Sequence, residues 1–413
     1  MTNALKLSSS TRRTLLKSLA ATGVISAFER KLAWAQSATD YKALVHIYQG
    51  GGNDGNNTVI RTDANGYAEY AKARPSSSGI NIAQAQLLPI QATNLTVPMG
   101  LHPSVTTFKT LFEQKKLAIV ANMGTLIQPG TRDQYKQGLL ARPVNLLSHP
   151  DQEMQMQAGD AKGIVRTGWG GRAADRLELL QTTSNFPLMC SINGLKTFTA
   201  GNTSIALALP NNPYFQLYWT GDTTTTNARD AALNELLLTS PTLNNYELTV
   251  KLLGEEGLAA SSVVMPVLQN AQSKVTPFFN GLETEVAKQL KMIALMLEGR
   301  AQVKLSRQIF FANQTGYDTH GSQISEQAKL LGDLNTAVDA FEKAMAALGL
   351  QNNVTTFVTS DFNRTLKAND ARGTEHAWGN YAFAWGGAVK GGQVYGKLPT
   401  LAIDGPDDLD GNG

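Results

Sequence analysis

The stretch Ala43-Leu-Val-His-Ile-Tyr-Gln-Gly-Gly-Gly-Asn-Asp-Gly55 decides the fold, because an apolar run passes abruptly into a glycine-rich loop. The run Ala43–Tyr48 is typical of a buried strand that feeds a loop. Short apolar runs predict further strands at 117–121, 308–312 and 354–359, and apolar periodicity predicts helices at 105–116 and 324–348. Strands that alternate with helices predict an α/β fold, a three-layer sandwich around a central, mostly parallel sheet.

Metal-ligating residue types follow the ends of three predicted strands. In an open parallel sheet, ligands bind at the carboxyl ends of the strands. The side chains expected there are Asp54, Asp318, His320, Asp361 and His376. Carboxylate oxygen and imidazole nitrogen both suit zinc or manganese, so we expect a divalent metal site, with zinc as the first choice and manganese or calcium as alternatives.

Each of these residues also has a purely structural interpretation. Asp54 lies in an ordinary turn sequence, and Asp318 with His320 can cap the helix that follows. Asp361 can end its strand in a turn, and His376 can be a hydrogen-bonded loop histidine. Their recurrence just after strands, close together in the chain, favours the metal site.

The glycine-rich loop 50–55 also fits the pattern G-x-G-x-x-G. A dinucleotide site requires a helix to begin there and to present its N-terminus to the pyrophosphate. Residues 56–60 are instead predicted to be β-like, so a nicotinamide or flavin site is not expected.

A nucleophile is harder to assign. Ser148 precedes a predicted helix start with Pro150 and Asp151, so it can cap that helix or act as a hydroxyl nucleophile at the helix N-terminus. His149 receives no role, because adjacent side chains rarely point the same way. Arg364, three residues after Asp361, can hold a phosphate or sulfate or form a surface salt bridge.

The N-terminus predicts export. A charged segment with Arg12 and Arg13 precedes a short apolar stretch at 19–28, and Ala33-Trp34-Ala35 fits a cleavage site. We therefore expect residues 1–35 to be a twin-arginine signal peptide, recognised by the twin-arginine translocase, and the mature protein to be periplasmic or secreted. An uncleaved anchor is the alternative. No later apolar run is long enough for a stable membrane span.

Composition bounds the rest of the chain. The predicted signal holds six of the 36 Lys and Arg residues and one of the 33 acidic residues, so residues 36–413 carry a net charge near −2 and do not indicate nucleic-acid binding. The single cysteine, Cys190, excludes an internal disulfide. Residues 36–413 are expected to form one domain, in which 195–272 is an insertion or cap.

As a set, the motifs resemble an exported bacterial family known as domain of unknown function 1501. They are Gly51-Gly-Asn-Asp-Gly-Asn-Asn-Thr58, Ser148-His-Pro-Asp-Gln152, Thr167-Gly-Trp-Gly-Gly-Arg172, Tyr317-Asp-Thr-His-Gly321, Thr359-Ser-Asp-Phe-Asn-Arg364 and Gly373-Thr-Glu-His-Ala-Trp-Gly379. That family looks like a member of the alkaline phosphatase and sulfatase superfamily. The resemblance implies an alkaline-phosphatase-like fold with a metal site at the carboxyl edge of its sheet.

The resemblance also implies roles for the candidate residues. Asp54 would follow the first strand as a ligand, Ser148 would occupy the nucleophile's region, and the remaining ligands would be shared between two metals, with Asp318, His320 and His376 on one and Asp361 on the other. Two-metal phosphatases of the superfamily usually carry histidine where this chain has Phe362, and only one residue separates Asp318 from His320, so a single-metal or non-catalytic site is the alternative. Family members continue past residue 413, so we expect this chain to be truncated.

These features predict a metal-dependent hydrolase whose substrate is a small anionic ester, a phosphate or a sulfate. The alternative is an exported, non-catalytic binding or assembly protein on the same fold. A redox enzyme with a bound nicotinamide or flavin is a third, less favoured hypothesis.

Overall fold

The computed structural model describes residues 40–178, 186–192, 194–214, 223–238 and 245–413. The predicted signal peptide therefore lies outside the described residues. Within them, no helix has the length and apolar character needed to cross a membrane.

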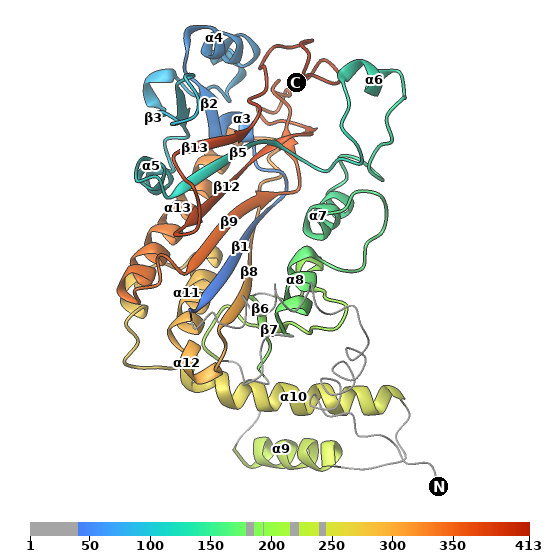
Figure 1. The fold of residues 1–413 in the computed structure, drawn as a ribbon, viewed down its shortest axis with the longest axis vertical. Coiled ribbons are helices and arrows are strands. Elements are labelled where there is room, and N and C mark those ends of the chain that lie inside the picture. The colour runs from blue at the N-terminus through green and yellow to red at the C-terminus, as the bar shows by residue number, and fades with distance from the viewer. Residues whose placement is uncertain (1–39, 179–185, 193, 215–222, 239–244) are drawn as a thin grey trace, which may run out of the picture.

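Eight strands form the central sheet, in the spatial order β13-β5-β12-β9-β1-β8-β6-β7 (Figure 1). All described neighbours in this sheet pair in parallel except β12, which runs antiparallel to both β5 and β9. The strands are β1 (Lys42–Gly50), β5 (Leu117–Met123), β6 (Met189–Ile192), β7 (Leu207–Leu209), β8 (Arg307–Thr315), β9 (Val354–Ser360), β12 (Asn380–Gly386) and β13 (Gln393–Gly396). The four strands predicted from the sequence are β1, β5, β8 and β9.

Helices cover both faces of this sheet. On one face lie α5 (Thr106–Glu113), α11 (Glu285–Glu298) and α13 (Gln323–Ala347), and on the other lie α7 (His149–Ala158) and α8 (Trp169–Glu178) (Figure 1). Side chains of β1 alternate between the two cores, because Val45 and Ile47 pack with the first group of helices and Tyr48 packs with α8. The predicted α/β sandwich with a mostly parallel sheet is confirmed.

The remaining elements surround this core. A small sheet of order β2-β4-β3 and a two-stranded ribbon of β10 and β11 lie outside the main sheet. These elements and the other helices are α3 (Gly55–Thr58), β2 (Val59–Arg61), α4 (Ala64–Ala73), β3 (Leu88–Ile90), β4 (Met99–Leu101), α6 (Arg132–Lys136), α9 (Thr223–Leu238), α10 (Asn245–Leu268), α12 (Arg300–Val303), β10 (Asn363–Arg364) and β11 (His376–Ala377).

Residues 56–60, expected to be β-like, begin instead with the single helical turn α3, and β2 starts only at Val59. The middle segment 195–272 contributes β7 to the edge of the sheet, and its helices α9 and α10 lie near the amino end of β1, at the opposite end of the sheet from α3 and α4 (Figure 1).

Strand register brings three chain segments to one edge. Gly50 at the end of β1 is paired with Thr315 at the end of β8, and Gln49 is paired with Ser360 at the end of β9. The loops that begin at Gly51, Gly316 and Asp361 therefore leave the sheet side by side.

Glu342 of α13 is expected to make stability depend on pH. Trp385 Nε1 of β12 donates to Glu342 Oε1 at 2.8 Å. Burial raises the pKa of Glu342, and the hydrogen bond from Trp385 only partly offsets this. A folded-state pKa above the unfolded value gives a stabilising contribution that is full below the unfolded pKa and is lost as the pH rises through the folded pKa.

We therefore expect Glu342→Gln, which keeps an acceptor for Trp385, to raise the free energy of unfolding at pH 8 by about 1 kcal/mol and to change it little below pH 4. Urea denaturation at the two pH values measures this. The exposed Glu283 is the matched control, and Glu283→Gln should have little effect at either pH. An equal gain at both pH values for Glu342→Gln would contradict the explanation.

Candidate metal centre

Three imidazole rings and one carboxylate converge at the carboxyl edge of the sheet. His376 Nε2 lies 3.1 Å from His149 Nε2 and 3.2 Å from His320 Nε2. Asp318 Oδ1 lies 3.3 Å from His149 Nε2, 2.9 Å from His320 Nε2 and 3.4 Å from His376 Nε2. Among the described residues, His149, Asp318 and His376 form a group whose ligand atoms all lie within 4.8 Å of one another.

These residues come from distant parts of the chain. Asp318 and His320 lie in the loop after β8, where the helix-capping alternative is not observed, since the backbone N–H of Gln323 at the start of α13 donates to Arg372 O. His376 begins β11, and His149 is the first residue of α7. Three of the four were expected at the site, and His149 is an addition from the structure.

The three rings share one further feature: each Nδ1 faces an acceptor outside the cluster. The acceptors are Asp361 Oδ2 for His149 (2.6 Å), Glu375 Oε2 for His320 (2.9 Å) and Leu147 O for His376 (2.7 Å). A carbonyl or carboxylate requires a hydrogen on the facing nitrogen, so in each neutral ring the Nε2 lone pair points into the cluster. Ligating histidines in metal sites are held in this way.

The cluster fits a small divalent cation. Zinc–nitrogen bonds of about 2.0–2.1 Å in a tetrahedron place the ligand atoms about 3.3 Å apart. The three edges of the His149–Asp318–His376 triangle measure 3.1, 3.3 and 3.4 Å. Nitrogen-rich donors suit zinc, or manganese, better than calcium, which prefers oxygen ligands alone. His320 Nε2 lies against two corners of this triangle.

Burial and neighbouring charges shift the pKa values of the cluster residues in different directions. Partial burial alone would raise the pKa of Asp318, but the hydrogen bond and charge of Arg364, with His149 and His320 nearby, lower it to about 2. The hydrogen bond to Asp361 raises the pKa of His149. Burial lowers the pKa of His376. Asp318 is therefore an anion at neutral pH, as a metal ligand must be.

Asp361 was predicted to bind a second metal, and the structure gives it a different place. It is 1% exposed, and its Oδ1 accepts the backbone N–H of Gly52 at 2.6 Å and of Gly51 at 3.1 Å. Its Oδ2 accepts Nδ1 of His149. In this arrangement Asp361 orients His149, a candidate ligand, through its Nδ1.

Two glycines allow this close packing. Gly51 has a φ of +115°, and a Cβ there would lie 2.5 Å from the backbone nitrogen of Asp318. Gly52 has a φ of +75°, and a Cβ there would lie 2.7 Å from the ring of Phe362. Only glycine combines these angles with so little space, so Gly51 allows the loop to approach the backbone at Asp318 and Gly52 allows it to approach the ring of Phe362.

Phe362 lies beside the cluster. Its ring centroid lies 4.5 Å from that of His149 and 4.8 Å from that of His376. A phenyl ring has no ligand atom, so this position contributes packing and no metal ligand.

Asp54 also differs from its predicted role as a ligand. It forms an ion pair with Arg74, in which Nη1 lies 2.6 Å from Oδ2 and both side chains are fully buried. Its Oδ2 also accepts from Gln323 Nε2 at 2.5 Å, and its Oδ1 accepts from the backbone N–H of Asn56 at 3.0 Å, which caps α3. Both oxygens are occupied, so Asp54 stabilises the fold beneath the site.

The N-terminus of α3 is likewise occupied. The N–H of Gly55 donates to Asn363 Oδ1 at 2.7 Å, and that of Asn56 donates to Asp54. A helical turn does follow the glycine-rich loop, but its first donors are already bonded, which argues against pyrophosphate binding there.

Arg364 was predicted to hold a phosphate or sulfate or to form a surface salt bridge, and the structure shows a buried side chain that pairs with Asp318. The side chain is fully buried, and its Nε donates to Gly52 O at 2.9 Å. Nη2 donates to Gly51 O at 2.5 Å and to Asp318 Oδ1. Arg364 therefore joins the glycine loop to the carboxylate of Asp318, a candidate metal ligand.

Ser148 lies where the sequence placed it, at the N-cap of α7 next to His149. Its hydroxyl makes no capping bond, and Oγ donates instead to Asp151 Oδ2 at 2.6 Å. The preceding residues Asn145 and Leu147 have positive φ values of 47° and 72°, a strained backbone for residues other than glycine. This strain accompanies the carbonyl contact from Leu147 to His376.

His149 is the residue that sequence reasoning missed. The sequence gives His149 no role, because the adjacent side chains of Ser148 and His149 are expected to point in different directions. At a helix start they do diverge: Ser148 turns to Asp151, and His149 turns to the cluster. A histidine at the first position of a predicted helix was the available signal.

The comparisons with known proteins agree with this architecture. A family model described as "Protein of unknown function (DUF1501)" matches residues 41–408, as the motifs predicted. The comparison with curated proteins found no match.

Solved structures resemble the chain only distantly. They include Ps i-CgsB (9% identity, 88% of this chain and 70% of that chain, TM-score 0.34) and the alkaline phosphatase from the Antarctic bacterium TAB5 (10% identity, 84% and 92%, TM-score 0.28). Another is the C-terminal periplasmic domain of EcEptC from Escherichia coli, in complex with Zn (11% identity, 84% and 73%, TM-score 0.28). Likeness at this level carries no inference about chemistry.

The geometry predicts one zinc ion per chain. We expect protein loaded with zinc and desalted to contain one equivalent by elemental analysis. Removing the hydrogen-bond partner of a metal ligand typically weakens metal binding by roughly 10- to 100-fold. Asp318→Asn changes a ligand itself, so it should weaken zinc binding by more than that. Asp333→Asn, on the surface of α13, is the matched control and should bind normally. Two equivalents in the wild type, or unchanged affinity in Asp318→Asn, would contradict the site.

The buried Asp54–Arg74 pair makes a separate prediction about stability. Arg74→Met leaves a buried carboxylate without its cation and should lower the free energy of unfolding by about 3–5 kcal/mol in urea denaturation. Adding Asp54→Asn should recover part of the loss, because the stranded charge is removed. The double variant should still bind one zinc ion. If the folded double variant bound no zinc, Asp54 would be a metal ligand after all.

Proposed function

We propose that this chain, which belongs to the family of proteins of unknown function DUF1501, is a metal-dependent hydrolase of phosphate or sulfate esters. One observation carries the proposal: the Nε2 atoms of His149, His320 and His376 and the Oδ1 of Asp318 converge, with every Nδ1 bonded elsewhere. Lone pairs at such distances repel unless a proton or a metal cation lies between them, and a divalent cation can serve several of these donors at once.

His149, Asp318 and His376 would hold the ion, with His320 beside them. Zinc is the first choice, and manganese suits the same donors. When bound, such an ion supplies Lewis-acid chemistry, because it polarises an ester oxygen and makes a hydroxyl nucleophile available at neutral pH. Three protein ligands and an open position are typical of catalytic rather than structural zinc sites.

The residues around the cluster keep it in one geometry. Asp361, Glu375 and the carbonyl of Leu147 each fix the ring orientation of one histidine. Arg364 holds Asp318 from the buried side. Ligands that are held before the substrate arrives need no reorganisation during the reaction, which favours catalysis.

Ser148 is the proposed nucleophile. It precedes a ligand directly in the chain, and Asp151 Oδ2, 2.6 Å from its Oγ, can accept the hydroxyl proton. The N-terminus of the ten-residue helix α7 also provides a positive electrostatic end for an anionic ester.

We also propose that the protein works outside the cytoplasm, in the periplasm or as a secreted protein. The support is the twin-arginine sequence pattern at residues 1–35, which implies the twin-arginine translocase as a transient partner.

The test is turnover of aryl phosphates and aryl sulfates by the zinc-loaded protein, with and without a chelator. We expect hydrolysis of at least one ester class, loss of activity with chelator, and recovery with zinc. Ser148→Ala should lower kcat by roughly 100-fold or more without releasing zinc. Ser262→Ala, on an exposed position of α10, is the control. Bound zinc with no turnover of any ester would instead favour the non-catalytic binding protein.

A further inference from the structure

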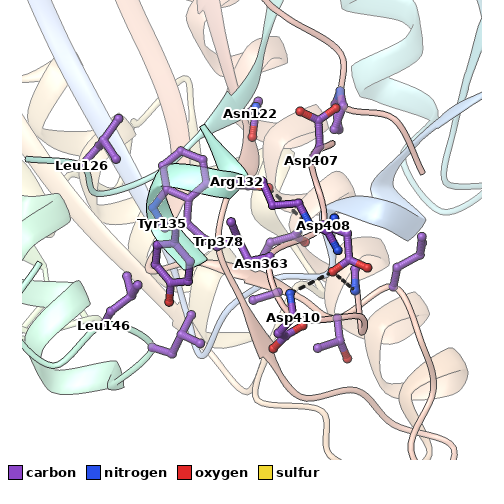
Figure 2. Close-up of a pocket in the computed structure, with 18 of the residues that line it drawn as sticks. Asn122, Leu126, Arg132, Tyr135, Leu146, Asn363, Trp378, Asp407, Asp408 and Asp410 are labelled. Atoms are coloured by element: carbon purple, nitrogen blue, oxygen red, sulfur yellow. Dashed lines mark hydrogen bonds between the residues drawn. The ribbon is translucent and has the colours of Figure 1, made fainter. Parts of the chain in front are cut away.

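Figure 2 shows part of the lining of a cavity of about 250 Å³. Two of the segments that line it also carry metal ligands. Leu146 and Leu147 line the cavity immediately before Ser148 and His149, and His376 itself lines it together with residues 377–379. Whatever occupies the cavity therefore lies beside the cluster.

The cavity offers carbon surfaces more than free polar groups. Trp378 Nε1 is already bonded to Thr125 O at 2.6 Å, so its ring surface remains for contact. The guanidinium of Arg142 stacks over the ring of Tyr135, 4.0 Å from its centroid. Leu126, 47% exposed, also lines the cavity and keeps an apolar side chain partly in water (Figure 2). Apolar surface at such a site is typical of ligand pockets.

The carboxylates that line the cavity are bonded to backbone groups of their own loop. Asp407 Oδ2 accepts from Thr400, and Asp408 accepts from the backbone N–H groups of Asp404 and Gly411 (Figure 2). The guanidinium of Arg132 is held in this wall, because its Nε is buried and its Nη2 lies 3.4 Å from Asp404 Oδ1. The polar groups of the wall are therefore largely engaged within the protein.

We propose that this cavity binds the organic group of the ester and selects for an apolar, aromatic group. This inference rests on the proposed function, since the anionic group is taken to lie at the cluster. The rings of Trp378 and Tyr135 and the side chains of Leu126 and Leu146 contact the organic group. Small alkyl esters leave the cavity unfilled and are poor ligands.

The inference is tested by binding, independently of turnover. Calorimetry on the zinc-loaded protein compares 4-nitrophenylphosphonate with methylphosphonate, and 4-nitrobenzenesulfonate with methanesulfonate. We expect the aromatic member of at least one pair to bind 10-fold or more tightly than its methyl partner. Equal affinities in both pairs would overturn the inference.

Matched variants locate the preference. Leu126→Asp places a charge in the cavity wall and should remove most of the aromatic advantage. Leu139→Asp adds the same charge at an exposed leucine, 65% accessible, that does not line the cavity, and it should retain the advantage. Both positions are exposed, so both variants should fold. An advantage that survives in Leu126→Asp, or that is lost equally in both variants, would overturn the assignment to this cavity.

Turnover of 4-nitrophenyl phosphate and sulfate separates the two proposals. An aromatic preference in binding without hydrolysis of any ester would end the proposed function and leave the cavity as a binding site for the organic group. Hydrolysis with no preference in binding would keep the proposed function and end the inference about the cavity.

Discussion

The carboxylate of Asp361 is the contact on which the rest of the site depends. It is buried at the end of β9, accepts the backbone N–H groups of Gly51 and Gly52 from the loop after β1, and accepts Nδ1 of His149 from the start of α7. A buried carboxylate must be fully hydrogen-bonded, and here the required donors come from two distant segments. The hydrogen bonds that the buried Asp361 carboxylate requires therefore position both the glycine loop and His149.

Two buried arginines beneath the candidate metal centre also pair with carboxylates. Arg74 neutralises Asp54 below α3, and Arg364 bonds to the carbonyls of the glycine loop while it neutralises Asp318. Buried charges of this kind are costly unless they are paired, so each pair fixes one local arrangement of the chain. Asp54 and Arg364 have the residue types of a binding site, but here they stabilise the chain beneath it.

The centre itself is defined by what surrounds each histidine. Because three Nδ1 atoms are bonded to acceptors, three Nε2 atoms face Asp318 and one another, and the ring of Phe362 closes one side with carbon. The same two segments that supply His149 and His376 continue into the apolar cavity. In the proposed function, the segments around His149 and His376 would therefore position the ion, the nucleophile and the organic group. Both segments lie at the carboxyl edge of the sheet.

The sequence by itself determined the strands β1, β5, β8 and β9, the helix α13 and the loops that carry Asp318, His320 and His376, because apolar periodicity and strand-end position are local properties of the chain. Only the tertiary structure decided which polar residues share a point in space. Asp54, Asp361 and Arg364 have the residue types of a site, but long-range partners such as Arg74 and the glycine N–H groups take up their hydrogen-bonding capacity. His149 was missed for the converse reason: its direction is set by a helix start and by Asp361, 212 residues away in the chain.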